Sequence, residues 1–409
     1  MAERFDTVVI GGGQAGLSIS YYLTQQGREH VVLEKGRVGN GWRSKKWDSF
    51  TLITPNWQLQ LPGFPYQGDD PDGYMDRDGV VQYIDDYVEL FNPPLRLGVE
   101  VTSVEEREDE DGFLIETDAG ALEASNVVVA TGTFQRPRIP DFSQRIAPDV
   151  VQLHSSLYRN PQKLPPGAVL VVGSGQSGCQ ITEELYQSGR KVYQCTGKAG
   201  RAPRRYRGKD FTWWLGQTGF VDRTVDDLES PAERFDPNPH VTGKDGGHTL
   251  NLHQFALDGV TLLGRLADGR GSTVWMADDL YDNLAAADKT ATQMKKGIDK
   301  FIEKTGMDAP EADEEELQAG YDQDVITELD LESAGVGSIV WAAGYDFDFR
   351  LVKLPIFDEF GYPVQERGVT DRPGLYFLGL HFLHTIKSGL FYGIAEDAAH
   401  VAEHIDDRS

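Results

Sequence analysis

Hydrophobic residues near the start of the chain fall into a strand, a helix and a second strand. Val8 to Ile10 form a short β-branched run, which is typical of a buried parallel strand. A glycine-rich turn follows, and the next segment has helical character up to Gly27, a common helix stop. Val31 to Leu33 then form a second apolar run. This order predicts a strand–turn–helix–strand unit over residues 6–34, as in nucleotide-binding folds.

The same pattern recurs from residue 168. An apolar run over residues 168–172 precedes a second glycine-rich turn, a helical segment that stops at Gly189, and a strand that leads to Thr196. This internal repeat is the strongest feature of the sequence, because two such units in one chain argue against coincidence. We therefore predict an α/β protein with two Rossmann-like dinucleotide-binding domains.

Short runs with polar interruptions lie between the two units. Residues 99–104, 113–116 and 121–124 are divided by Asp, Gly and acidic clusters, which predicts a β-meander inserted in the first domain. Residues 127–130 are apolar again and should return to the parallel sheet. Prolines from Pro137 onwards indicate a linker to the second domain.

The C-terminal pattern predicts a return to the first domain. Strands are expected over residues 338–341 and 375–379, and a helix over residues 388–405 with alanines on its packing side. The N-terminus of that helix is a candidate to face the cofactor of the first domain. The predicted first domain comprises residues 1–150 and 331–409, and the second comprises residues 151–330.

The first glycine turn has the spacing G-x-G-x-x-G. Gly11 permits the tight turn, Gly13 lets the backbone approach a pyrophosphate, and Gly16 lets the helix pack closely on the strand. Glu34 ends the second strand, where an acid binds a ribose hydroxyl. The N-terminal position favours FAD by analogy with other flavoproteins. The cofactor contacts predicted here are Gly11, Gly13, Gln14, Ala15, Gly16, Glu34 and Lys35.

Further contacts to FAD are expected from small and aromatic residues. Residues 130–132 read Ala-Thr-Gly, and small side chains let the chain pass close to a cofactor. The glycine-rich loop around Trp42 is a candidate to lie over the cofactor, and an ordinary turn with a packed tryptophan is the alternative. The additional predicted contacts are Gly41, Trp42, Val101, Ala130, Thr131, Gly132, Gly379 and Leu390.

The second glycine turn differs from the first in its charge. Thr196 occupies the position that Glu34 has in the first unit, and six Lys or Arg residues follow before the next acid. A 2′-phosphate repels an acid and binds arginine, so the sequence favours NADP over NAD. A solvated basic loop or an interface is the alternative. The predicted contacts are Gly173, Gly175, Gln176, Ser177, Gly178, Thr196, Lys198, Arg204 and Arg205.

Net charge and cysteine content limit the binding partners and the cellular compartment that we expect. A net charge of −26 argues against binding to nucleic acid or to an anionic membrane. The sequence has no apolar run of membrane-spanning length, and its first strand starts too early to leave room for a signal peptide. Cys179 and Cys195 are the only cysteines, so we expect a reducing compartment, the cytoplasm by default. No metal cluster is evident, and the oligomeric state is not readable from the sequence.

With both glycine turns, the Ala-Thr-Gly turn and the C-terminal strand and helix, the chain resembles the class B flavin-containing monooxygenases. It is most similar to the plant YUCCA-type branch, over Trp47 to Pro65, and to bacterial flavoproteins described as associated with cation transport. His154 and Tyr158 match the end of the family fingerprint. The Phe and Gly of that fingerprint fall on Pro148 and Val150 here, so the match is partial.

The resemblance implies an activity with FAD, NADPH and O2. NADPH would reduce FAD, and O2 would form a C4a-(hydro)peroxyflavin that oxygenates a small organic substrate. N- or S-oxygenation, Baeyer–Villiger insertion and decarboxylation of a 2-oxo acid all use these cofactors. A flavin disulfide reductase is one alternative, although it needs a redox cysteine pair near the flavin. An NADPH-responsive flavin sensor without catalytic activity is another.

Candidate catalytic residues follow from the resemblance and from two loops. Animal-type relatives have an asparagine near the flavin, and an ungapped alignment places Ile53 there, with Asn56 three residues later. Asn56 and Gln60 lie in the proline-containing segment 47–66, an irregular loop of the kind that often lines active sites. His384, in the loop before the last helix, is a candidate for proton transfer. The predicted catalytic residues are Asn56, Gln60 and His384.

Overall fold

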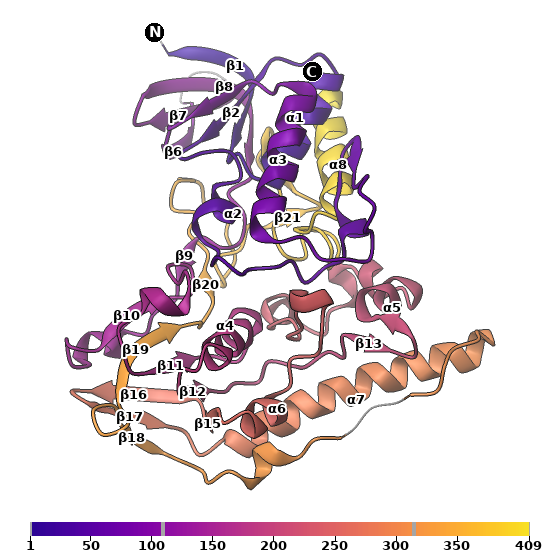
Figure 1. Cartoon of the computed structure of the whole chain (residues 1–409). Helices are drawn as coiled ribbons and strands as arrows, with labels where there is room; N and C mark the ends of the chain where they lie inside the picture. The colour runs from indigo at the N-terminus through magenta and orange to yellow at the C-terminus, as the bar shows by residue number, and fades with distance from the viewer. Residues whose placement is uncertain (1, 108–110, 313–315, 409) are drawn as a thin grey trace.

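The computed structural model describes residues 2–107, 111–312 and 316–408. These residues form two α/β units, one above the other in Figure 1, and both ends of the chain lie in the upper unit. We call the upper unit, which contains the first glycine turn, the first unit, and the lower one the second unit. The two Rossmann-like halves predicted from the sequence are confirmed.

The first unit is built on a nine-stranded sheet. Its main path runs in the order β21-β22-β23-β8-β1-β2-β5, and β6 and β7 extend it beside β8. The strands are β1 (Glu3–Ile10), β2 (His30–Glu34), β5 (Leu95–Leu97), β6 (Val101–Glu106), β7 (Phe113–Thr117), β8 (Gly120–Val129), β21 (Gln365–Glu366), β22 (Val369–Thr370) and β23 (Leu375–Phe377). The helices are α1 (Gln14–Gln25), α2 (Asn40–Ser44), α3 (Arg77–Phe91) and α8 (Ile394–Asp407).

Apolar residues lie side by side on the neighbouring strands at the centre of this sheet. Val8 lies beside Val31 on one side and Val127 on the other, and all three are buried. The helices α1 and α8 pack against each other beside the sheet (Figure 1). A continuous β-branched run with both faces covered is what a central parallel strand requires. Helix α3 is capped at its start by Asp76, whose Oδ1 accepts a hydrogen bond from Gly79 N at 2.7 Å.

The predicted meander is formed by β6, β7 and β8, and its last run is continuous with the predicted return strand. Two separate elements are predicted over residues 121–124 and 127–130, but β8 runs from Gly120 to Val129 without a break. Its first half pairs antiparallel with β7, and most of its length pairs parallel with β1. The polar residue between the two runs does not break the strand, because Asn126 is buried and its Nδ2 donates to Asp6 O at 3.3 Å.

The second unit is built on a five-stranded parallel sheet in the order β10-β19-β11-β12-β15. A three-stranded antiparallel sheet, β16-β17-β18, lies beside it. The strands are β10 (Val151–His154), β11 (Ala168–Val172), β12 (Val192–Cys195), β15 (Thr261–Leu263), β16 (Leu266–Arg270), β17 (Thr273–Met276), β18 (Glu328–Asp330) and β19 (Val336–Trp341). The helices are α4 (Gln176–Gln187), α5 (Phe211–Gln217), α6 (Leu252–Leu257) and α7 (Leu280–Thr305).

Two boundaries near the C-terminus differ from the sequence analysis. Strand β19 pairs between β10 and β11, so the chain returns to the first unit after Trp341 and not at residue 331. The final helix begins at Ile394, and the residues from Ser388 to Gly393 form turns. These turns are stabilised because Ser388 Oγ accepts hydrogen bonds from the backbone N–H groups of His384 and Thr385, each at 3.0 Å.

Small β-pairs and turns complete the fold. The loop expected over residues 47–66 is irregular apart from one 3₁₀ turn, Asn56–Gln58, and the pair β3–β4. The short strands are β3 (Gln60–Leu61), β4 (Phe64–Pro65), β9 (Arg136–Pro137), β13 (Arg205–Tyr206), β14 (Lys209–Asp210) and β20 (Tyr345–Asp346). Within the described ranges, none of the helices combines the length and apolar character that a membrane crossing requires.

Candidate functional site

The first glycine turn has the close contacts that its spacing predicts. Gly11 has a φ of +115°, and a Cβ there would lie 2.5 Å from Ala130 O. A Cβ on Gly16 would lie 1.9 Å from Gly11 O, so only glycine lets α1 pack on β1. At Gly13 the space is open, since a Cβ would meet no described atom within 4 Å. Because Gly13 is also the N-cap of α1, the first N–H groups of the helix face that space.

Glu34 closes this turn. Its Oε2 accepts a hydrogen bond from Gly12 N at 2.9 Å, and its Oε1 accepts one from Gly36 N at 2.8 Å. Each carboxylate oxygen keeps a second lone pair, so a ribose contact by Glu34 stays compatible with the geometry. Lys35 points away, because it is 66% exposed and lies 3.5 Å from Glu100. Val101 starts β6 and is half-buried.

Several of the predicted contacts meet at the start of α1. Trp42 Nε1 donates to Gln14 Oε1 at 3.2 Å, and Gln14 Nε2 donates to Gly389 O at 3.3 Å. A Cβ on Gly379 would lie 2.6 Å from the Cβ of Ala15, so the end of the β23 segment touches the helix start. Trp42, which lies in helix α2, therefore contacts the start of α1, and its position over the cofactor stays a prediction. Gly41 beside it is exposed.

The Ala-Thr-Gly turn after β8 is fixed by a residue that the sequence analysis did not select. Gln135 Nε2 donates to Thr131 Oγ1 at 2.8 Å and to Gly132 O at 2.9 Å. Its Oε1 accepts a hydrogen bond from Asp348 N, which belongs to the segment that returns from β19. Gln135 thus joins the two places where the chain crosses between the units.

Leu390 is not at a helix N-terminus. It lies in the turns before α8 and its side chain is 43% exposed. The predicted dipole contact between this position and a flavin is therefore wrong, because the helix begins four positions later, at Ile394. The turn itself stays at the site through the contact of Gly389 O with Gln14.

The second glycine turn repeats the geometry of the first. Gly173 has a φ of +116°, and a Cβ there would lie 2.6 Å from Ala342 O. A Cβ on Gly178 would lie 2.0 Å from Gly173 O, while Gly175 faces open space among the described atoms. The turn that starts at Ala342 therefore takes the place that the Ala130 turn has in the first unit. Gly175 is the N-cap of α4, so a second set of helix N–H groups is available to an anion.

Two polar side chains around the second turn already form hydrogen bonds with other protein groups. Gln176 exchanges two hydrogen bonds with the backbone of Val241, through Nε2 to the carbonyl and through Oε1 from the N–H at 3.1 Å. Ser177 is half-buried in the first turn of α4. Thr196 is buried; its hydroxyl donates to Leu263 O at 2.7 Å and accepts from Asn283 Nδ2 at 3.2 Å. The predicted cofactor contact by Thr196 is therefore wrong.

The two arginines chosen for a 2′-phosphate bind protein groups instead. Arg204 is 1% exposed and pairs with Asp210 at 2.5 Å. The guanidinium of Arg205 donates to the carbonyls of Gly246 and Gly247 at 2.7 and 2.8 Å. These contacts contradict the predicted roles of Arg204 and Arg205, because each guanidinium is committed to its own partners. Lys198, three residues after the end of β12, is exposed and stays a candidate.

The three predicted catalytic residues are not brought together. Asn56 Nδ2 donates to Asp70 O at 2.9 Å, and in the described part of the chain its buried Oδ1 has no partner. Gln60 is exposed and its Nε2 donates to Trp57 O at 3.0 Å, and its catalytic role stays a prediction. His384 is half-buried, and burial lowers the pKa of its imidazole. No hydrogen bond joins these side chains among the described residues.

Lys46 is a site residue that the sequence analysis missed. Its Nζ lies 5.3 Å from the ring centre of Trp42, 4.9 Å from that of Phe50 and 5.2 Å from that of Phe134. Phe134 follows the Ala-Thr-Gly turn, so the ammonium group lies between two of the predicted cofactor segments. Burial, with the nearby Lys45, lowers the pKa of Lys46 to about 8. The available sequence signal was a lysine among closely spaced aromatic residues.

Lys46→Met is expected to stabilise the protein at pH 7 by about 1–2 kcal/mol, since it removes a cation that burial disfavours and cation–π contacts only partly compensate. The folded pKa of Lys46 is about 8 and the ordinary value is 10.5. The unfolded chain therefore binds this proton more strongly, so the penalty is complete below about pH 8 and disappears as the pH rises towards 10.5. Urea unfolding at pH 7 and at about pH 9.5 measures the difference. The exposed Lys35→Met is the control, and equal gains in both variants would contradict the expectation.

Comparison with known proteins places the chain in a family. Residues 8–215 match the family model described as pyridine nucleotide-disulphide oxidoreductase. The chain is also 32% identical to an oxidoreductase named CzcO-like from Geobacillus kaustophilus, over 99% of both chains. This chain belongs to the pyridine nucleotide-disulphide oxidoreductase family. It is an oxidoreductase of the CzcO-like line, which confirms the bacterial branch expected from the sequence.

Two further similarities connect this family member to monooxygenases. The chain is 30% identical to the indole-3-pyruvate monooxygenase YUCCA1 of Oryza sativa, over 45% of this chain and 46% of that one. A flavin-containing monooxygenase from Stenotrophomonas maltophilia has the same fold, with a TM-score of 0.66, 19% identity and 99% coverage of both chains. These matches confirm the resemblance to class B flavin-containing monooxygenases. A bacillithiol disulfide reductase from Bacillus cereus shares the fold as well, with a TM-score of 0.64, 15% identity and full coverage.

Proposed function

We propose that the chain is an NADPH-dependent FAD monooxygenase that acts on a small organic substrate with O2. The repeated glycine turn carries this proposal. Each turn ends at a helix whose N-cap is glycine, and each leaves open space at its middle glycine, Gly13 or Gly175. A pyrophosphate needs such space, because its oxygens must approach backbone N–H groups closely. The residues present therefore fit two dinucleotides.

In this proposal the first turn holds FAD and the second holds NADPH. FAD supplies the electron transfer and oxygen chemistry when it is bound. The protein would bind and orient the cofactor and exclude water: the α1 N-terminus would receive the pyrophosphate, Glu34 would orient the ribose, and Trp42 of helix α2 would cover the cofactor. The solved neighbours with flavin or NADP in their names, such as an ornithine N-hydroxylase from Kutzneria, support this pairing of cofactors.

Lys198→Ala is expected to raise the KM for NADPH about tenfold and the KM for NADH less than about twofold. Lys198 is the exposed cation next to the second turn, and one charge-assisted hydrogen bond to a 2′-phosphate contributes about 1.4 kcal/mol there. Initial rates with both nucleotides measure the effect. Arg205→Ala serves as the matched control and should leave both constants unchanged, since Arg205 is bound to Gly246 and Gly247. Equal effects on NADPH and NADH would contradict the assignment.

The cysteines disfavour a disulfide reductase. Cys179 and Cys195 are buried, and burial raises the pKa of each thiol to about 12. A thiol needs to ionise before it can attack a disulfide, so neither residue is suited to that chemistry. The shared fold with a bacillithiol disulfide reductase keeps that reaction as the second candidate function, by a route that does not use these cysteines. The two free cysteines also keep a reducing compartment, the cytoplasm, as the prediction.

The substrate type is not fixed by the residues of the site. The similarity to a YUCCA enzyme favours a carbonyl-bearing organic acid, and N- or S-oxygenation and Baeyer–Villiger insertion stay as alternatives. A flavin sensor without catalytic activity would bind the same cofactors. Multiple turnover with a small substrate separates an enzyme from such a sensor.

The deciding experiment is a visible spectrum of the purified protein, followed by NADPH oxidation in air with and without candidate substrates. The proposal predicts a flavin spectrum, a preference for NADPH over NADH, and oxygen incorporated into one substrate class. Oxidation that yields only hydrogen peroxide with every substrate would favour the sensor. Reduction of a disulfide substrate at the expense of NADPH would favour the reductase. A protein that takes up no FAD would overturn the assignment of the first turn.

A further inference from the structure

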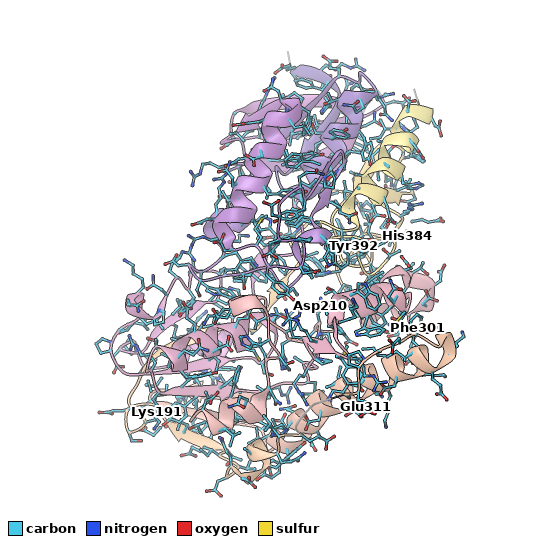
Figure 2. All side chains as sticks on the ribbon, turned by 45° about the vertical axis from the view of Figure 1, so that its right-hand side comes forward. Lys191, Asp210, Phe301, Glu311, His384 and Tyr392 are labelled. Atoms are coloured by element: carbon cyan, nitrogen blue, oxygen red, sulfur yellow. The ribbon has the colours of Figure 1, made fainter. Side chains whose placement is uncertain are left out.

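A buried ion pair lies at the boundary between the two units. Arg204 Nη2 is 2.5 Å from Asp210 Oδ1, and the arginine side chain is 1% exposed. Arg204 directly precedes β13 and Asp210 is the last residue of β14, and Asp210 also caps α5 by accepting from Thr212 N at 2.8 Å. Figure 2 shows Asp210 near the boundary with the first unit. Contacts within the second unit therefore already hold both side chains of the ion pair in place.

The pair also bonds to the first unit. Arg204 Nη1 donates to Ile53 O at 2.7 Å, and Tyr74 OH donates to Asp210 Oδ2 at 2.5 Å. The Tyr74 ring centre lies 4.8 Å from the Arg204 guanidinium carbon. Ile53 and Tyr74 belong to the long loop between α2 and α3 of the first unit. The ion pair thus holds this loop at two points.

The backbone of the second unit closes on the same loop. A Cβ on Gly243 would lie 2.0 Å from Leu52 O, and a Cβ on Gly247 would lie 2.6 Å from the Tyr74 ring. Glycine is required at these two positions because any side chain would push the loop away. Tight packing surrounds the ion pair, so the contact is desolvated and its hydrogen bonds are strong.

Charge balance within this group keeps the acid ionised. Burial by itself raises the pKa of Asp210, but Arg204 and the hydrogen bonds from Thr212 and Tyr74 hold the pKa below its ordinary value. Another polar contact between the units is more exposed: Lys387 reaches Asp222, whose side chain is 65% exposed. A solvent-exposed pair of that kind contributes little to fixed geometry.

We propose that Tyr74, Arg204 and Asp210 form a positioning clamp that sets the distance between the two nucleotide-binding units. This inference rests on the proposed function. There, NADPH bound at the second turn would be the reductant and FAD bound at the first turn the oxidant, with a hydride, one proton with two electrons, passing from the nicotinamide to the flavin. Such transfer needs the reacting atoms about 3–3.5 Å apart, and a misplacement of about 1 Å costs about 100-fold in rate. The clamp also fixes the loop that carries Asn56, whose buried Oδ1 is unpartnered among the described residues.

Tyr74→Phe tests the clamp with the smallest change. It removes the hydroxyl that crosses the boundary and keeps the ring over Arg204. Tyr206→Phe is the matched control, because the Tyr206 hydroxyl donates to Asp299 Oδ2 at 2.8 Å inside the second unit. Anaerobic stopped-flow reduction of the flavin by NADPH gives a limiting rate and a Kd for each variant.

The clamp predicts a split result. In Tyr74→Phe the limiting rate of flavin reduction should fall about tenfold, the effect of one lost charge-assisted hydrogen bond, while the Kd for NADPH changes less than about twofold. Tyr206→Phe should behave as the wild type. A wild-type limiting rate in Tyr74→Phe, or equal losses in both variants, would overturn the positioning role.

Hydrogen exchange separates this inference from the proposed function. The clamp predicts faster amide exchange in Tyr74→Phe on both sides of the boundary, over residues 50–75 and 241–248, without any nucleotide added, and no such change in Tyr206→Phe. Unchanged exchange in Tyr74→Phe would show that the clamp does not hold the units. If NADPH fails to reduce the wild-type flavin, the proposed function and the positioning role both fall, while the exchange result still decides whether the clamp joins the units.

Discussion

Gly16→Ala is expected to yield a protein that purifies without flavin, with the Kd for FAD raised at least about 100-fold, or about 2.7 kcal/mol. The added Cβ would lie 1.9 Å from Gly11 O, a distance that no rotamer can relieve because both atoms are fixed to backbone. The start of α1 must therefore move away from β1. That movement displaces the N–H groups that would receive the pyrophosphate. Flavin content by absorbance and FAD titration of the apoprotein measure the loss.

Two other glycines provide controls for this variant. Gly13→Ala meets no described atom within 4 Å, so the fold should keep its melting temperature while FAD binding weakens, because the methyl group occupies the space for the pyrophosphate. Gly27→Ala, at a φ of +69° beyond the end of α1, should lower stability by about 1 kcal/mol and leave FAD binding unchanged. A Gly16→Ala protein with wild-type flavin content would contradict the packing argument.

Arg204→Met is expected to lower the free energy of unfolding by about 3–5 kcal/mol. The substitution leaves Asp210 buried without its cation, and a buried pair broken on one side costs this much. Because the pKa of Asp210 is held below its ordinary 3.8, the contribution of the carboxylate is present above about pH 4 and is lost as the pH falls through the lower folded value. Urea unfolding at pH 7 measures the loss.

A double variant separates charge from packing in this prediction. Arg204→Met with Asp210→Leu should recover a large part of the lost stability, because two apolar side chains replace an ion pair without leaving a charge unpaired. Arg205→Met should change stability by less than about 1 kcal/mol, as its guanidinium is exposed. Equal losses at positions 204 and 205 would show that the ion pair has no special role.

Local sequence patterns predicted the features that depend on neighbours in the chain. The turns at Gly11 and Gly173 were predictable because each needs a positive φ and close backbone contact within one strand–helix unit. The strand at Val8 to Ile10 was predictable from its β-branched run. These elements carry the two glycine turns of the candidate site.

Features that depend on distant contacts were not predictable in this way. Arg204 appeared to be free for a phosphate, but its partner Ile53 O lies 151 positions away in the sequence. The hydroxyl of Thr196 is taken by Leu263 O, across a strand pair that no local pattern indicates. The ammonium group of Lys46 lies against three aromatic rings, and one of them, Phe134, belongs to a distant segment of the chain. Residue type predicted the charge or polarity of each side chain, and tertiary contacts determined which partners it binds.

The order of the strands has a consequence for synthesis of the chain. Strand β8 pairs with β1 on one side and with β23 on the other, and the whole second unit is encoded between β8 and β23. During translation, the unit that begins first is therefore completed last. Until residues 375–377 leave the ribosome, the end of β8 over residues 127–129 presents an unpaired edge, a surface prone to aggregation and bound by chaperones. A chain whose translation stops before residue 375 should contain the complete sequence of the second unit. Its first sheet should lack strand β23, the neighbour of β8.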